Sequence, residues 1–149
     1  MHWAATGEAT PMYASPEERA AGIERGPRMS GAELAEWANR SAAELWTSMG
    51  ELTEGQWLSE VATAQGRTVP ATEVPWLRAR EVFVHAVDLD CGVSFGDLPR
   101  DFLEALVADI TAKRGLGAVP ADGPLPEVAA WLAGRPHALA DAPPLGPWL

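Results

Sequence analysis

The chain has 149 residues, and a hydrophobic content of 47% with seven tryptophans is enough for one compact domain with a hydrophobic core. The net charge is −10 and the 11 basic residues are scattered, which argues against binding to nucleic acid or to anionic membranes, because phosphates would be repelled. No stretch approaches the roughly 20 apolar residues that span a bilayer, and the N-terminal sequence MHWAATGEATP lacks the basic and apolar regions of an export signal.

Two helices are predicted in the first third of the chain. In the segment SPEERAAGIERG, Ser15 is expected to cap the first helix, with Glu18 closing a capping box and Gly26 ending the helix. In the segment SGAELAEWANRSAAELWTSMG, Ser30 is the expected N-cap of a second helix over about residues 31–49. Apolar residues recur in the second helix at helical spacing, which predicts an amphipathic helix with one buried face.

A short hairpin or an irregular loop is predicted around Gly66, which separates two short runs of β-tolerant residues. Thr72 is the expected N-cap of the next helix, which contains WLRAREVFVHAVDLD, runs to about Cys91 and ends at Gly92. Apolar residues lie nearly all round this helix, so we expect it to be central and buried.

The last third of the chain predicts one more long helix and then an irregular segment. The stretch DLPRDFLEALVADITAKRG is helical in pattern, and its expected buried face consists of Phe102, Leu103, Leu106, Val107 and Ile110. Seven of the 13 prolines lie between Pro120 and Pro147, and only PEVAAWLAG predicts a short helix there. We expect residues 116–149 to form an extended Pro-rich C-terminal arm that is anchored by Trp131 and Trp148. The predicted fold class is therefore all-α, a helical bundle followed by this arm.

Four ionisable side chains lie on one arc of the expected central helix: Arg78, Glu81, His85 and Asp88. Glu81 and His85 are four residues apart, so their Cβ atoms lie roughly 5–6 Å from each other, close enough to hold one ion between them. Zinc accepts both carboxylate oxygen and imidazole nitrogen, so this pair is a candidate for part of a metal site. One alternative is buried ion pairing, which the same spacing also fits, because a buried carboxylate and a buried imidazole each need a partner. The other is a solvated polar stripe, which we favour least because the helix is expected to be buried.

Neighbouring polar residues have two interpretations each. Asp88 is either an acceptor that orients the ring of a metal-bound His85 or a simple ion-pair partner of that histidine. Arg78 and Arg80 are candidates to contact an anionic substrate or cofactor, and Arg78 is alternatively the partner of Glu81.

The remaining polar and aromatic residues suggest no second site. The single cysteine, Cys91, excludes an internal disulfide and fits the reducing cytosol, so we expect a cytoplasmic protein in which Cys91 is a small buried residue. His137 lies in the C-terminal arm and is expected to be solvated. The tryptophans are expected to anchor the core and the arm rather than to stack on bases, given the acidic charge.

Three longer stretches carry a more specific signal: TPMYASPEERAAGIERG, GRTVPATEVPWLRAREVFVHAVDLDCGVSFGDLPRDFLEAL and GPLPEVAAWLAGR…PPLGPWL. Together they resemble the mycothiol-dependent maleylpyruvate isomerase family. The resemblance implies a DinB-like four-helix bundle that binds a divalent metal, usually zinc, through His, Glu and His. The Glu and the second His of that pattern match Glu81 and His85. The implied reaction is attack by metal-bound mycothiol thiolate on the double bond of maleylpyruvate, followed by rotation and thiol elimination to give fumarylpyruvate.

The resemblance starts at about Trp3 and departs from the family in two places. The first metal-binding His of the family lies on an earlier helix, and His2 aligns past that position. We therefore expect residues 1–115 to form a DinB-like bundle that lacks its first helix or helices, with an incomplete metal site. Residues 116–149 are expected to be the remnant of the C-terminal domain, with its strands absent and with no clear counterpart of the family's substrate-binding Arg.

Three hypotheses for the function follow. The leading one is a mycothiol-dependent isomerase or thiol transferase that acts on an unsaturated dicarboxylate, in which zinc lowers the pKa of the thiol and the cofactor, not the protein, supplies that thiol. An alternative is a non-catalytic helical module that dimerises or complements a partner chain, because a bundle short of a helix exposes an apolar groove. A third is a related bundle that uses a different low-molecular-weight thiol or another electrophile.

Overall fold

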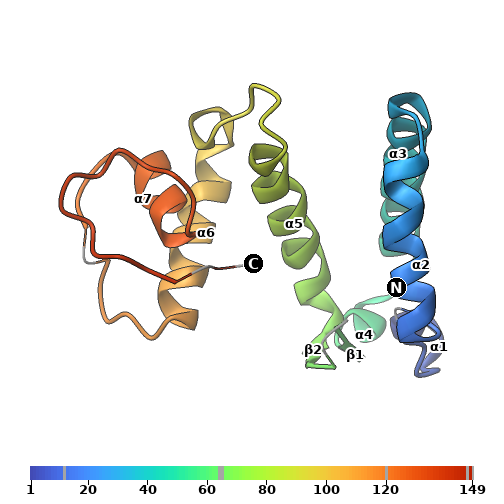
Figure 1. Ribbon diagram of the computed structural model, residues 1–149. Coiled ribbons are helices and arrows are strands. Elements are labelled where there is room, and N and C mark those ends of the chain that lie inside the picture. The colour runs from blue at the N-terminus through green and yellow to red at the C-terminus, as the bar shows by residue number, and fades with distance from the viewer. Residues whose placement is uncertain (12, 64–65, 120, 147, 149) are drawn as a thin grey trace. The chain divides into compact units, whose positions relative to one another are not determined.

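The computed structural model describes residues 1–11, 13–63, 66–119, 121–146 and 148. These residues form seven α-helices and one two-stranded hairpin, joined by short 3-10 turns (Figure 1). The elements are α1 His2–Thr6, α2 Pro16–Arg25, α3 Gly31–Gly50, α4 Glu54–Trp57, β1 Glu60–Ala62, β2 Thr68–Pro70, α5 Val74–Asp88, α6 Arg100–Lys113 and α7 Leu125–Leu132. The predicted helical fold class is thus confirmed.

The chain divides into two compact units, Met1–Trp76 and Leu77–Leu149, with the boundary near the start of α5. The predicted division into a bundle and an arm at residue 115 concerns family domains and stays a prediction. Within the described part of the chain, none of the helices combines the length and the apolar character that crossing a membrane requires.

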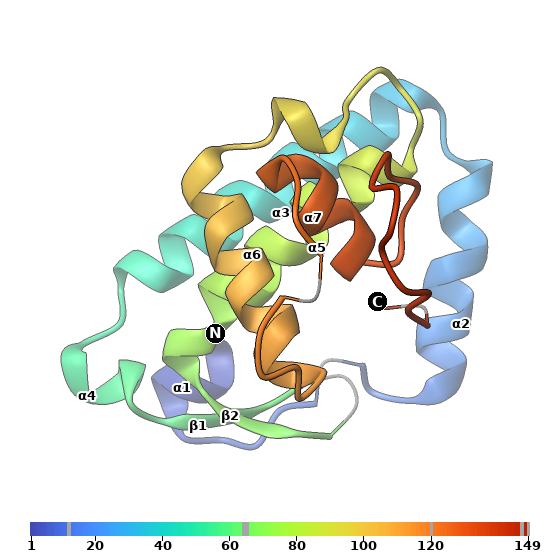
Figure 2. The same ribbon diagram turned by 90° about the vertical axis from the view of Figure 1, so that its left-hand side faces the viewer.

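The first unit contains the predicted hairpin. Strands β1 and β2 are antiparallel, with Val61 paired to Val69, and both valines are buried. Gly66 has the positive φ of 78° that the turn into β2 requires, and its backbone N–H donates to Thr63. Helix α1 packs against α4 and against strand β1 of the hairpin (Figure 2). Between the two helices, the side-chain amide of Gln56 donates to the carbonyl of Ala5 at 2.8 Å.

Capping largely follows the sequence prediction. The Ser15 hydroxyl accepts from the backbone N–H of Glu18, but the Glu18 carboxylate accepts from Ala14, one residue before the cap. The predicted end at Gly26 is confirmed, because α2 ends at Arg25 with Gly26 as its C-cap, although Gly26 keeps right-handed helical angles and leads directly into a 3-10 turn. The second helix is confirmed, since Ser30 forms a complete capping box at the start of α3.

The predicted buried face of α3 is wrong. No residue of this helix is buried, and Trp37 and Trp46 keep 47% and 76% of their surface exposed. The helix makes few close contacts with the other elements of its unit, so its apolar side chains are left largely uncovered there. These two tryptophans are therefore not the core anchors that the sequence predicts.

The second unit has its core between α6 and α7. The largest fully buried side chains are Leu106 and Ile110 from α6, Leu132 from α7 and Val84 from α5. Helix α5 packs on α6 through Phe83 and Phe102, whose ring centroids are 4.6 Å apart. The predicted buried face of α6 is confirmed, except that Val107 is only half-buried.

Helix α5 differs from its prediction at both ends. It begins at Val74, after a 3-10 turn that contains Thr72, and it ends at Asp88, because Asp90 has a φ of 51°. Only Val84 is buried in this helix, so the expectation of a buried central helix is wrong. Cys91 lies beyond the helix end and is exposed, contrary to the prediction that it is buried.

The C-terminal arm is anchored as predicted. The Trp131 ring is 2% exposed and its indole N–H donates to the carbonyl of Pro143 at 2.8 Å. The Arg114 side chain donates to the carbonyl of Gly146 at 2.7 Å. His137 is exposed, as expected.

Candidate functional site

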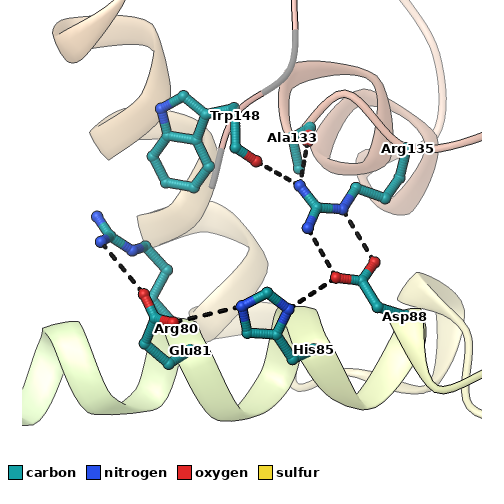
Figure 3. A network of polar contacts seen from close by, with 7 residues as sticks. All are labelled: Arg80, Glu81, His85, Asp88, Ala133, Arg135 and Trp148. Atoms are coloured by element: carbon teal, nitrogen blue, oxygen red, sulfur yellow. Dashed lines mark hydrogen bonds and ion pairs between the residues drawn. The ribbon is translucent and has the colours of Figure 1, made fainter. Parts of the chain in front are cut away.

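The ring of His85 lies between two carboxylates on the same face of α5. Its Nε2 atom is 3.3 Å from Oε2 of Glu81, and its Nδ1 atom is 2.8 Å from Oδ2 of Asp88 (Figure 3). The spacing of four and three residues places the three side chains on neighbouring turns, so the helix itself sets this geometry. All three residues belong to the second compact unit.

These side chains are not buried as the sequence predicts. The side chains of His85, Glu81 and Asp88 are 50%, 46% and 33% exposed. Helix α5 packs on α6 through Phe83, and Val84 is its one fully buried residue, whereas the arc that carries the acidic residues is partly open to solvent. An ion or a small molecule can therefore reach the pair.

Asp88 is held by a residue that the sequence reasoning missed. Arg135 donates from Nε to Oδ1 of Asp88 at 3.0 Å and from Nη2 to Oδ2 at 2.7 Å, a paired geometry in which both carboxylate oxygens are fixed. These hydrogen bonds, with a smaller contribution from His85, outweigh partial burial and lower the pKa of Asp88 from 3.8 to about 2. Asp88 is therefore a carboxylate at neutral pH.

Arg80 occupies the other end of the network. Its guanidinium is 3.7 Å from Glu81 and 3.5 Å from Asp109 of α6, and it lies 4.9 Å from the centre of the Trp148 ring. Only 11% of its side chain is exposed, so these contacts occupy it. Arg80, not Arg78, is the arginine partner of Glu81, because its side chain extends toward α6, where Asp109 attracts it.

Arg78, the other candidate for anion binding, is exposed. Among the residues that the structure describes, its side chain has no ion pair. Of the two predicted arginines, Arg78 is thus the one available to an anionic small molecule, whereas Arg80 is engaged with its neighbours. His2 lies in the other compact unit, exposed beside Glu8 at 3.8 Å.

The Glu81–His85 pair fits two ligands of one metal ion. Two atoms that each bind zinc at roughly 2.0–2.2 Å with a tetrahedral angle lie about 3.4 Å apart, close to the 3.3 Å between Nε2 and Oε2. Within the described ranges, no group of three or more His, Cys, Asp and Glu residues could hold a metal ion together. The same geometry also fits an ion pair between Glu81 and a protonated His85.

Comparisons with known proteins point to one family. The profile of the mycothiol maleylpyruvate isomerase N-terminal domain matches residues 1–90. A crystal structure of the mycothiol-dependent maleylpyruvate isomerase is 38% identical, with a TM-score of 0.78 over 93% of this chain and 68% of that chain. A histidine-to-alanine mutant of the mycothiol-dependent maleylpyruvate isomerase is 39% identical, with a TM-score of 0.76 over 91% of this chain and 66% of that chain. No curated protein sequence matches the chain.

Proposed function

The chain belongs to the mycothiol maleylpyruvate isomerase N-terminal domain family, and we propose that it binds a divalent cation, zinc, between Glu81 and His85 and acts in a thiol-dependent cis–trans isomerisation. The resemblance noted in the sequence is thus confirmed as family membership. The similar solved structures are isomerases that depend on mycothiol and act on maleylpyruvate, so these are the first thiol and the first unsaturated dicarboxylate to test.

One observation carries the proposal: the two nitrogens of a single imidazole ring each face a carboxylate. A neutral ring has one N–H, and the shorter contact of 2.8 Å favours its donation from Nδ1 to Asp88. The lone pair of Nε2 in this neutral tautomer then faces the negative oxygen of Glu81, and a cation between the two atoms removes the repulsion, as a proton on Nε2 would also do. Zinc is a cation that suits both ligand atoms.

The proposed chemistry assigns separate roles to the residues. A bound divalent cation would lower the pKa of a thiol and so supply a thiolate nucleophile at neutral pH. The half-exposed positions of Glu81 and His85 leave room for this thiol, and Asp88 orients the histidine ring. Arg78, exposed one turn before Glu81, would hold a substrate carboxylate.

The reaction needs no nucleophile from the protein. Addition of the thiolate to the double bond forms a carbon–sulfur bond and moves the π electrons toward the neighbouring carbonyl. The remaining single bond rotates, and loss of the thiolate restores the double bond in the trans geometry. The exposed Cys91 has no part in this scheme. A free, exposed cysteine favours a reducing compartment, the cytoplasm, as the place where the protein acts.

Zinc titration of chelator-treated protein by calorimetry tests the cation site. Wild-type protein should bind one zinc ion, and Glu81→Gln or His85→Ala should weaken binding by at least roughly tenfold, because each removes one of two ligands. Glu36→Gln is the matched control for Glu81→Gln, since Glu36 forms an exposed i,i+4 pair with Arg40. The two substitutions change the net charge by the same amount. Equal affinity in all variants, or no zinc uptake by the wild type, would rule out the site.

Turnover of maleylpyruvate tests the reaction separately. With zinc present, mycothiol should support formation of fumarylpyruvate, and glutathione in its place identifies a protein that uses another thiol. Activity that survives His85→Ala would contradict the role of the pair even if zinc binds elsewhere.

A second candidate function is a non-catalytic helical module that associates with a second copy of itself. The exposed Trp37, Trp46 and Leu34 of α3 favour it, because apolar surface of this kind is stabilised when it is covered. Analytical ultracentrifugation of the wild type and of Trp46→Ser distinguishes the two: a dimer that dissociates on this substitution, in a protein without zinc affinity, supports the module.

A further inference from the structure

We propose that Arg135 is a positioning residue for the Glu81–His85 pair. Arg135 fixes Asp88, and through Asp88 it orients the ring of His85 so that Nε2 faces Glu81. This inference rests on the proposed function for its purpose but not for its geometry. It also makes the C-terminal arm, from which Arg135 extends, part of the site on α5 (Figure 3).

The backbone of Arg135 is fixed by the way α7 ends. Gly134 has a φ of 70°, its N–H donates to the carbonyl of Trp131, and the N–H of Arg135 donates to the carbonyl of Ala130. These two bonds form a Schellman motif, which depends on a left-handed residue such as glycine at this position. The chain therefore leaves α7 in a defined direction at Arg135.

The side chain of Arg135 is fixed in turn by contacts on several sides. Its Nε and Nη2 atoms donate to the two oxygens of Asp88, and its Nη1 atom donates to the carbonyls of Ala133, at 2.6 Å, and Trp148. Only 14% of the side chain is exposed. Because a guanidinium is planar and its donors are rigidly spaced, these acceptors together determine the plane in which the Asp88 carboxylate lies.

The orientation of Asp88 determines which nitrogen of His85 carries the proton. Oδ2 of Asp88 accepts from both Arg135 and Nδ1 of His85, so the carboxylate directs the histidine toward the Nδ1–H tautomer. In this tautomer the lone pair is on Nε2, the atom that is 3.3 Å from Glu81. Without Arg135, Asp88 would be free to turn into solvent, since a third of its side chain is already exposed.

Trp148 connects the two ends of this arrangement. Its carbonyl accepts from Arg135, and its ring lies against Arg80, which contacts Glu81. The arm therefore restrains His85 through one arginine and Glu81 through another. All of these residues lie in the second compact unit, so the arrangement does not depend on the position of the first.

The test begins with the metal-free protein. Proteins with ¹⁵N-labelled histidine are compared by NMR at a pH above the range in which histidine side chains are protonated. His85 of the wild type should show mainly the Nδ1–H tautomer, whereas Arg135→Met should shift it toward the Nε2–H tautomer. Arg135→Lys keeps the positive charge without the paired geometry and should give an intermediate result, which also covers the case in which Arg135→Met does not fold.

Zinc affinity, measured by calorimetry, is the second measurement. Removal of a residue that orients a metal-binding histidine typically weakens binding 10–100-fold, and we expect a loss of about this size for Arg135→Met. Arg100→Met is the matched control, because it removes a guanidinium of the same compact unit whose pair with Glu104 is exposed. It should change neither the tautomer nor the affinity.

The outcomes separate the inference from the function on which it rests. A tautomer that does not change in either Arg135 variant overturns the positioning role, whether or not zinc binds. A tautomer shift in the Arg135 variants together with no zinc binding by the wild type supports the positioning role and overturns the proposed function. Equal effects of Arg100→Met and Arg135→Met overturn the positioning role, because they would reflect a general loss of charge or stability.

Discussion

Replacement of Asp88 by Asn should change how the stability of the protein depends on pH. The pKa of Asp88 is lowered from 3.8 to about 2, mainly by its hydrogen bonds from Arg135 and less by those from His85. A carboxyl group whose pKa is lower in the folded state stabilises the fold as long as it is ionised. Asparagine does not titrate, so it removes this contribution at every pH.

The size of the effect follows from the shift in pKa. A change from 3.8 to about 2 corresponds to roughly 2 kcal/mol at 1.36 kcal/mol per unit. Because a third of the Asp88 side chain is exposed, solvent screening reduces the expected contribution to about 1–1.5 kcal/mol. The folded-state pKa is depressed, so this stability is present above pH 3.8 and is lost as the pH falls from there toward 2.

Urea unfolding of wild type and Asp88→Asn over a series of pH values measures this difference directly. The free energy of unfolding of the wild type should exceed that of the variant near neutral pH, and the gap should close as the solution becomes acidic. The difference between the two proteins cancels the contributions of the other acidic residues. A gap that stays constant across the acidic range would refute the assignment of the low pKa to Asp88.

Four further substitutions test the fold. Leu106→Ala should lower the free energy of unfolding by about 2–5 kcal/mol, because Leu106 is fully buried. Leu58→Ala is the control at a 73% exposed position and should change the free energy of unfolding by less than about 0.5 kcal/mol. Similar losses in the two variants would contradict the assigned core. Ser30→Ala should cost about 1 kcal/mol by removing the cap of α3, and an unchanged melting temperature would show that the cap contributes nothing. Gly134→Ala should lower the free energy of unfolding by about 1–2 kcal/mol, because a residue with a Cβ atom is strained at the φ of 70° that Gly134 adopts. A stability equal to that of the wild type would contradict the Schellman motif.

Local interactions are the part of this structure that the sequence predicts well. The capping box of Ser30 and the pair of Glu81 and His85 join residues only three or four positions apart, where helix geometry alone brings side chains together. The buried face of α6 follows from its apolar spacing in the same way. Each of these features needs no knowledge of the rest of the chain.

Burial and long-range partners are the parts that could not be predicted. Apolar residues all round α5 indicate that the helix can be covered, but they do not say which element covers it, and only Val84 is buried. Arg135 lies 47 residues from Asp88, and its position depends on the Schellman turn at Gly134. A Gly-Arg pair at the end of a short helix predicts the turn but not its partner.

The partial exposure of Glu81 and His85 favours a cation site over the buried ion pair that the sequence also allows. A fully buried pair would require two charges to lose their hydration, and that cost commonly cancels their mutual attraction. At about half exposure this cost is small, but so is the gain, so the Glu81–His85 pair alone does not explain why the ring of His85 is held in one orientation. Under the proposed function, the fixed ring presents the Nε2 lone pair beside a carboxylate to an incoming ion, and affinity for a metal ion depends on the direction of the donor atoms.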